Sequence, residues 1–334
     1  MSTCATVSRA LDEPLSGTAA TASTWLLLEQ PGPWGARALT SSRLDPEVGR
    51  ALEAAAEGTG VRVALIRRPG RHADPGGPSE RRVYAAHTVP GRAWLHTAAT
   101  RDPAELLALD FRALGAGDHH GFDAVLGGRP HPSDPLALVC TNGKRDRCCA
   151  LLGRPLAAEL AASGVEGAWE VTHLGGHRFS PTLLVLPHGY AYGRAEAHSV
   201  KEILHSLQEG RIVTEGCRGR SAWERPGQAA ELAVRTSLRE EAPDALSVVR
   251  TEGGAPHWDV TVAHADGRHW RVVVAQGTSL PPREESCGTS VLGAPARMDV
   301  VSVRELVPAG ATAGGPRAAA EGSRAAVGGS RAAA

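Results

Sequence analysis

The stretch LALVCTNGKRDRCCALLGRPLAAEL, residues 136–160, decides the fold that we expect for the centre of the chain. Its first four residues form a short apolar run that is typical of a buried strand, and Cys140 follows at the carboxyl end of that strand. Pro155 and Gly164 mark the start and the stop of a helix over residues 155–162. Ligands of open α/β sheets gather at the carboxyl ends of the strands. The stretch therefore predicts an α/β unit with a thiol at its ligand-binding edge.

A second stretch, WEVTHLGGHR at residues 169–178, follows the same logic. Residues 169–171 read as a short strand that leads to His173, and the glycines before His177 allow a tight turn around a bound group. A further strand is expected over residues 182–186. Capping-box spacing, Ser199 to Glu202, predicts the start of the next helix. The order strand, loop, helix, strand, strand, helix resembles most of a thioredoxin-like unit.

The rest of the chain divides by composition and periodicity into further segments. We expect an α/β fold with five parts: a flexible N-terminal tail (1–20), an N-terminal α/β unit (21–130), the thioredoxin-like unit (131–210), a C-terminal α+β region (211–308) and a disordered Ala/Gly/Arg tail (309–334).

Composition excludes several classes of function. The 334 residues carry 36 basic and 36 acidic side chains, so there is no basic footprint for nucleic acid or for an anionic membrane. No apolar stretch reaches the roughly 18 residues of a membrane span. The first residues lack the charged start and apolar run of a secretory signal, so we expect a cytoplasmic protein.

Six cysteines have more meaning in a reducing compartment, where disulfides are rare and clustered thiols indicate metal or redox chemistry. Three of them, Cys140, Cys148 and Cys149, lie within ten residues. We expect Cys4 to lie in a frayed terminus. Cys217 and Cys287 stand alone, and we interpret them as ordinary buried thiols unless the fold brings either of them to the cluster.

Three kinds of site suit these thiols and the pair His173 and His177. Thiolate and imidazole favour zinc, copper or iron–sulfur chemistry over magnesium or calcium. The histidine spacing suits zinc, but the spacing from Cys140 to Cys149 is too wide for a zinc finger, so zinc and a [2Fe–2S] cluster both stay open. A Rieske centre takes one Cys and one His from each loop, and this sequence segregates them. Thiol–disulfide exchange by Cys148 and Cys149 is weakened by the strained ring that adjacent cysteines would form.

The two central stretches are similar to the sucrase/ferredoxin-like family. CTNGKRDRCCALLGRPLAAEL (140–160) and WEVTHLGGHRFSPTLLVLPHGYAYGR (169–194) carry the resemblance, and RGRSAW (218–223) and SCG (286–288) are outlying matches. The resemblance implies a [2Fe–2S] cluster whose ligands are Cys140, Cys149, His173 and His177. Cys148 is the alternative second thiol, and Cys149 is preferred because related members keep a cysteine nine positions after the first.

The function that this resemblance implies is one-electron transfer with an unidentified redox partner protein, without nucleic acid and without a membrane. Alternatives are a structural zinc domain of an interaction protein and a thiol–disulfide oxidoreductase. Sucrose hydrolysis needs two carboxylates across a sugar cleft, and no motif in the sequence supplies them. We therefore expect an electron carrier and assign no catalytic residue.

Overall fold

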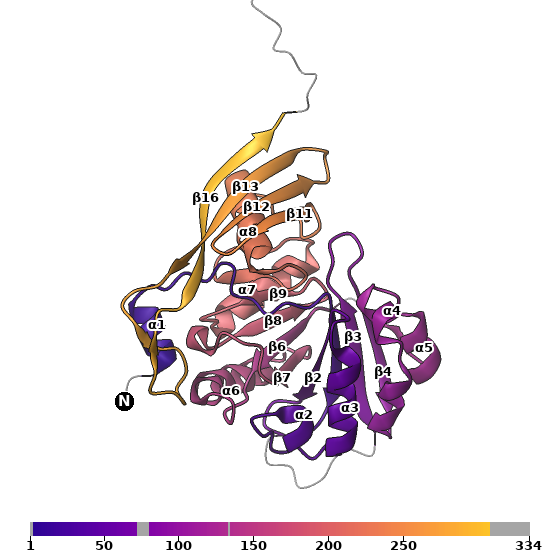
Figure 1. The fold of residues 1–334 in the computed structure, drawn as a ribbon. Coiled ribbons are helices and arrows are strands. Elements are labelled where there is room, and N and C mark those ends of the chain that lie inside the picture. Colours follow the sequence, from indigo (N-terminus) through magenta and orange to yellow (C-terminus); the bar gives the residue numbers. More distant parts are fainter. Residues whose placement is uncertain (1–2, 72–79, 133, 308–334) are drawn as a thin grey trace, which may run out of the picture.

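A ten-stranded mixed sheet runs through the centre of the molecule (Figure 1). The structure, a computed structural model, describes residues 3–71, 80–132 and 134–307. The strands of the sheet, in the order in which they lie side by side, are β10 (Cys217–Arg220), β9 (Tyr190–Tyr192), β8 (Leu183–Leu186), β6 (Leu136–Cys140), β7 (Ala168–Val171), β2 (Val61–Arg67), β1 (Thr24–Glu29), β3 (Arg81–His87), β4 (Trp94–Thr100) and β5 (Arg129–Pro130). The predicted α/β class is confirmed.

Helices pack beside both halves of this sheet. They are α1 (Cys4–Ala10), α2 (Ala38–Ser41), α3 (Pro46–Ala56), α4 (Phe111–Gly115), α5 (His120–Leu126), α6 (Arg147–Ala162), α7 (Ala197–Gln208) and α8 (Arg225–Leu238), with 3₁₀ turns η2 (Pro103–Ala108) and η3 (His177–Phe179). In Figure 1, α2 to α5 lie by the first half of the sheet and α6 and α7 by the second. Among the residues that the structure describes, none of these helices has the length and apolar character that crossing a membrane requires.

The two halves of the sheet have the same topology. In the second half, β6 pairs in parallel with β7 and antiparallel with β8, which pairs antiparallel with β9. In the first half, β1 pairs in parallel with β2 and antiparallel with β3, which pairs antiparallel with β4. An antiparallel pair, β2 with β7, joins the halves. The strand order expected of the thioredoxin-like unit therefore occurs twice in the sheet. The sequence predicts it only for the second half.

The two halves of the sheet differ in the residue at which the first strand of each half ends. Strand β6 ends on Cys140, whereas β1 ends on Glu29. The loop after β1, residues 30–37, contains neither cysteine nor histidine. The loop at the carboxyl end of β1 therefore offers no thiol or imidazole, whereas β6 ends on a thiol.

Helix α6 begins at Arg147, eight residues before the start predicted from Pro155. The side chain of Asp146 caps this helix by accepting a hydrogen bond from the backbone N–H of Cys148, at 2.8 Å. Pro155 lies inside the helix on an exposed position. The correction matters because it moves Cys148 and Cys149 from a loop into the first turn of a helix.

A smaller correction concerns the helix predicted from Ser199. It is α7 and it begins at Ala197, with Glu196 as the N-cap residue. Ser199 is the third helical residue, and its hydroxyl accepts a hydrogen bond from the backbone N–H of Glu196. Ser199 therefore belongs to a capping box, but as its third helical residue and not as the N-cap residue that the sequence predicts.

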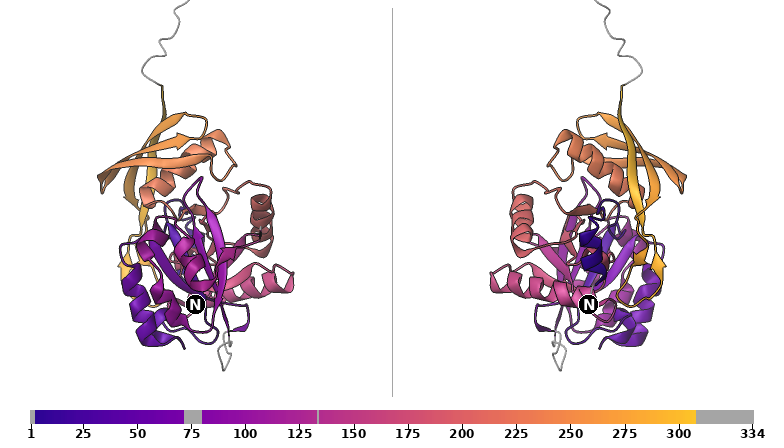
Figure 2. Two further views of the ribbon diagram at one scale, coloured as in Figure 1. Left: turned by 90° about the vertical axis from the view of Figure 1, so that its right-hand side faces the viewer. Right: turned by 90° about the vertical axis from the view of Figure 1, so that its left-hand side faces the viewer.

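The C-terminal region is an antiparallel sheet that packs on α8. It consists of β11 (Leu246–Gly254), β12 (His257–His264), β13 (His269–Thr278) and β16 (Ala296–Leu306), with a small hairpin of β14 (Arg283–Glu284) and β15 (Leu292–Gly293) inserted between β13 and β16. Both side views show this sheet as a layer at one end of the molecule (Figure 2). The inserted hairpin leaves that layer and returns to α1 and the start of α6 (Figure 1).

The segment boundaries predicted from composition need correction. Residues 1–20 were expected to be a flexible tail, but they contain α1, whose Cys4 is buried against Cys148. The boundaries at residues 130 and 210 do not divide the sheet, because β2 pairs with β7 and β10 pairs with β9. Backbone hydrogen bonds between these strands therefore join the three predicted segments 21–130, 131–210 and 211–308 into one sheet. The predicted tail over residues 309–334 lies outside the described residues.

A buried histidine in the first half of the sheet makes the free energy of unfolding decrease at acid pH. His87 is 1% exposed, and its Nδ1 lies 2.9 Å from the Thr24 hydroxyl. That hydroxyl donates to the Leu114 carbonyl, so Nδ1 carries the proton and Nε2 is a buried lone pair without a partner. Burial, with help from Arg92 and Arg220, lowers the pKa of His87 to about 4.

We expect His87 to make the protein lose about 2–3 kcal/mol of unfolding free energy between pH 6.5 and pH 4. The pKa is lower in the folded state than in the unfolded state, so the unfolded state binds the proton first as the pH falls. Urea unfolding of His87→Gln should show a shallower acid loss than the native chain. His120→Gln, at an exposed histidine, should follow the native curve. Equal slopes for all three proteins would contradict the assignment.

Candidate metal centre

Two neighbouring parallel strands bring the predicted thiols and imidazoles to one edge of the sheet. Strand β6 ends at Cys140, which pairs in register with Val171, the last residue of β7. His173 follows β7 directly, and Cys149 lies in the first turn of α6, which starts after the loop from β6. Because the carboxyl ends of parallel strands meet at the same edge, residues 33 positions apart in sequence come into contact.

The structure groups three of the four predicted ligands tightly. The Nδ1 atom of His173 lies 4.0 Å from the Cys140 sulfur and 3.9 Å from the Cys149 sulfur. These three donor atoms all lie within 4.8 Å of one another. The ring of His177 lies beside this group, with its centroid 5.4 Å from that of His173. Two thiols and one imidazole therefore form a tight group, and the second imidazole lies beside His173.

The side chain of His177 has a buried nitrogen lone pair that accepts no hydrogen bond. Its Nε2 lies 2.7 Å from the carbonyl oxygen of Glu285, which can only accept, so Nε2 carries the proton. Its Nδ1 is then unprotonated, and it is buried without a hydrogen-bond partner. A buried acceptor without a partner is costly unless it has another role, and binding a metal is such a role. The Asp146 carboxylate, 3.6 Å from Nε2, reinforces this tautomer.

The electrostatics of the site favour a thiolate at Cys140. A hydrogen bond from the Cys149 thiol, together with one from His173, lowers the pKa of Cys140 although burial acts the other way. The pKa of Cys149 is raised because its S–H is the donor in that bond and because it is buried. The first proton is therefore lost from the pair at Cys140, and a metal must displace the second.

Two arginines support the histidine loop and balance the charge of this thiolate. Arg62 donates to the carbonyl of His173 at 2.9 Å, and the buried Arg218 donates to the carbonyl of Gly175 at 3.2 Å. Burial lowers the pKa of each guanidinium, and the Cys140 thiolate partly offsets that lowering. Gly176 has φ +68°, and a Cβ there would lie 2.1 Å from Arg218, so this turn requires glycine.

Cys148 points away from this group. Its sulfur lies 3.4 Å from that of Cys4 and 3.1 Å from that of Cys287. Successive residues on a helix are rotated by about 100°, so adjacent cysteines in the first turn of α6 reach different neighbours. The sequence left Cys148 and Cys149 open as the second thiol. The structure brings Cys149 to Cys140 and His173, and it brings Cys148 to a separate group.

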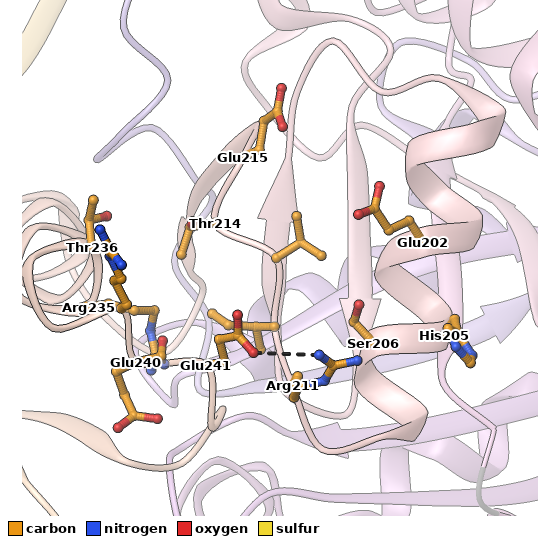
Figure 3. A pocket seen from close by; sticks show the side chains of 13 residues that line it. Glu202, His205, Ser206, Arg211, Thr214, Glu215, Arg235, Thr236, Glu240 and Glu241 are labelled. Carbon is orange, nitrogen blue, oxygen red and sulfur yellow. Dashed lines mark hydrogen bonds and ion pairs between the residues drawn. The ribbon is translucent and has the colours of Figure 1, made fainter.

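A large cleft elsewhere in the molecule does not take part. A cavity of about 650 Å³ lies between α7, α8 and residues 211–215, and most of the side chains that line it are polar (Figure 3). Arg211 spans it to Glu241 at 3.7 Å and also pairs with Glu209. None of the cysteines or histidines of the group above lines this cavity. It offers no chemistry that the thiols would share.

A comparison with protein families decides the relationship. The family model described as sucrase/ferredoxin-like matches residues 15–219, which is more than half of the chain. The chain belongs to the sucrase/ferredoxin-like family. No curated protein and no solved structure matches it. The matched range of this sucrase/ferredoxin-like protein covers both halves of the sheet and all four predicted ligands, and it stops before α8.

Cys4 and Glu285, which lie near the site, carry no local signal in the sequence. Asp146 lies inside the loop between the cysteines, and the structure shows that its side chain caps α6. The stretch RGRSAW (218–223) contains Arg218, which holds the histidine loop, and SCG (286–288) contains Cys287; the family model itself ends at residue 219.

Proposed function

We propose that this sucrase/ferredoxin-like protein is an electron carrier that binds a [2Fe–2S] cluster through Cys140, Cys149, His173 and His177. The observation that carries the proposal is the buried lone pair on His177 Nδ1, in a ring that lies beside His173, whose own Nδ1 is grouped with the two thiols. The donor set of two sulfurs and two nitrogens suits iron–sulfur chemistry. When bound, the cluster would accept and release one electron.

The residues of the chain prepare this site in three ways. Cys140 and Cys149 share a proton and lose it on binding, so the sulfurs become ligands without a large rearrangement. Glu285 and Asp146 hold the proton of His177 on Nε2 and leave Nδ1 free. Arg62 and Arg218 fix the histidine loop and place positive charge against the thiolates.

Zinc at the same residues is the second candidate, because one spacing favours it. Zinc bonds of about 2.3 Å to sulfur and 2.0–2.1 Å to nitrogen place tetrahedral ligand atoms about 3.6 Å apart. The observed sulfur-to-nitrogen distances of 3.9 and 4.0 Å lie close to that value. Thiol–disulfide exchange between Cys148 and Cys149 has no such support, since the two sulfurs belong to different groups.

The proposal includes an unidentified redox partner protein and a cytoplasmic location. All six cysteines are free thiols, which suits a reducing compartment. Sucrose hydrolysis is not part of it. The carboxylate at the site, Asp146, accepts hydrogen bonds from Cys148, Ser286 and Cys287 and is 3% exposed, so it is not available as an acid or base in a sugar cleft.

We expect protein purified without oxygen to be red-brown, to bleach with dithionite and to contain about two iron atoms per chain. Visible absorption together with iron and zinc analysis tests this directly. Colourless protein with zinc in place of iron at Cys140 and Cys149 would contradict the [2Fe–2S] cluster and favour a zinc site. Colour without bleaching would contradict electron transfer.

A further inference from the structure

Three cysteines from remote parts of the chain meet at the start of α6. Cys4 comes from α1, Cys148 from the first turn of α6, and Cys287 from the loop between β14 and β15. Their sulfurs are 3.4 Å (Cys4 to Cys148), 3.1 Å (Cys148 to Cys287) and 3.5 Å (Cys287 to Cys4) apart. Asp146 completes the group, with Oδ1 3.9 Å from the Cys4 sulfur. All four donor atoms lie within 4.8 Å of one another.

Hydrophobic packing does not explain this meeting. The buried cluster at this point consists of the three cysteines and Ala5, without any large apolar side chain from the part of the chain that the structure describes. Helix α1 has seven residues, and a helix of that length is not stable in isolation. Ion pairs from Glu13 to Arg178 (2.6 Å) and to Arg283 (2.8 Å) help to fasten α1 and the β14–β15 hairpin, but they do not explain why three sulfurs meet at one point.

A disulfide fits the triangle poorly. A sulfur–sulfur bond is about 2.05 Å long, and bonding any two of the sulfurs would leave the third thiol unpaired. Three thiolates around one ion suit a soft metal, and zinc adds a fourth, oxygen or nitrogen, ligand in a tetrahedron. With zinc–sulfur bonds of about 2.3 Å the sulfurs would be about 3.8 Å apart, so each pair would open by roughly 0.3–0.7 Å.

We propose that Cys4, Cys148 and Cys287 bind one zinc ion, with Oδ1 of Asp146 as the fourth ligand. Binding forms three zinc–sulfur bonds, and each cysteine that is still protonated loses its S–H proton to the solvent. The inference stands on these four residues and holds whichever metal the first site binds.

This ion would fasten the segment that orients His177. The carbonyl of Glu285 accepts the Nε2 proton of His177. In the next two residues, the hydroxyl of Ser286 and the backbone N–H of Cys287 donate to Oδ2 of Asp146, each at 2.9 Å. Asp146 also lies 3.6 Å from His177. Zinc bound by Cys287 therefore holds the same short segment that fixes the tautomer of His177, and the second site acts as a clamp on the first.

The test uses the full-length chain, incubated with Zn²⁺ and desalted, in four forms: native, Cys4→Ser, Cys287→Ser and Cys217→Ser. We expect about one zinc ion per native chain at this site, with three zinc–sulfur bonds of about 2.3 Å in X-ray absorption at the zinc edge. Cys4→Ser and Cys287→Ser should each lose at least about nine-tenths of that zinc, since a tetrahedral site rarely survives the loss of a thiolate. Metal bound through Cys140 and Cys149 should stay with the chain in Cys4→Ser.

Cys217 is the matched control, because it is buried on β10 and belongs to a different core cluster. Cys217→Ser should bind zinc like the native chain. Native protein without zinc, or a chain lighter by two hydrogens with Cys148 joined to Cys287, would overturn the proposal, and neither observation depends on a variant that folds. Full zinc in both Cys4→Ser and Cys287→Ser would overturn it as well.

Discussion

Replacing Cys149 with serine is expected to remove at least about nine-tenths of the bound iron, whereas Cys148→Ser leaves the iron in place. The two cysteines are neighbours in sequence, yet the sulfur of Cys149 lies 3.9 Å from His173 and that of Cys148 lies 3.1 Å from Cys287. Iron analysis and visible absorption of the two variants, prepared side by side without oxygen, measure the difference.

The two substitutions form a matched pair, because each changes one sulfur to oxygen in the first turn of the same helix. Any general damage to α6 should therefore appear in both. Cys148→Ser should instead lose the zinc proposed for the second group. Equal iron loss in both variants would show that the helix start, and not a particular ligand, had been disturbed. Iron loss in Cys148→Ser alone would reverse the ligand assignment.

The pattern around β6 and β7 could be recognised from the sequence because its signals are local. The apolar run before Cys140, the strand before His173 and the glycines before His177 each lie within a few residues of the group that they position. Parallel pairing of the two strands then brings Cys140 and His173 together by a general rule of α/β sheets. The α/β class follows from the same alternation of strands and helices.

The second cysteine group could not be found in this way. Its contacts join residues 144 and 139 positions apart, and no periodicity relates α1 or the β14–β15 hairpin to α6. The start of α6 was misplaced for a related reason: Pro155 is a strong local signal for a first turn, but the cap at Asp146 depends on a side chain that sits in a charged, glycine-containing loop. The second cysteine group and the start of α6 both depend on contacts that the local sequence pattern does not reveal.

Asp146 shows how these features combine at one side chain. Its Oδ1 caps α6 through Cys148, and its Oδ2 accepts from Cys287 and lies near His177. Burial raises its pKa, but His177 and these hydrogen bonds more than offset that effect, so the pKa is lowered and the carboxylate stays charged. One buried anion thus orders the helix that carries Cys149, the segment that carries Cys287 and the imidazole of His177.

His177→Cys should lower the midpoint potential at pH 7 by on the order of 100 mV or more, because a thiolate adds negative charge where neutral imidazole adds none. The potential of the native protein should also fall with rising pH, by about 59 mV per unit, once the Nε2 proton of His177 is lost from the oxidised state. The carbonyl of Glu285 accepts that proton at 2.7 Å, and we expect this proton to be the one that titrates. The variant lacks it and should show a smaller slope.

Redox titrations from pH 6 to pH 10, followed by visible absorption, would measure both effects. His188→Cys is the control, since His188 contacts Asp244 near the turn between β8 and β9 and should leave potential and slope unchanged. A potential in His177→Cys equal to that of the native protein would remove His177 from the ligand set. A lowered potential with the full native slope would keep His177 as a ligand but assign the titrating proton to His173, whose imidazole is the other nitrogen donor of the group.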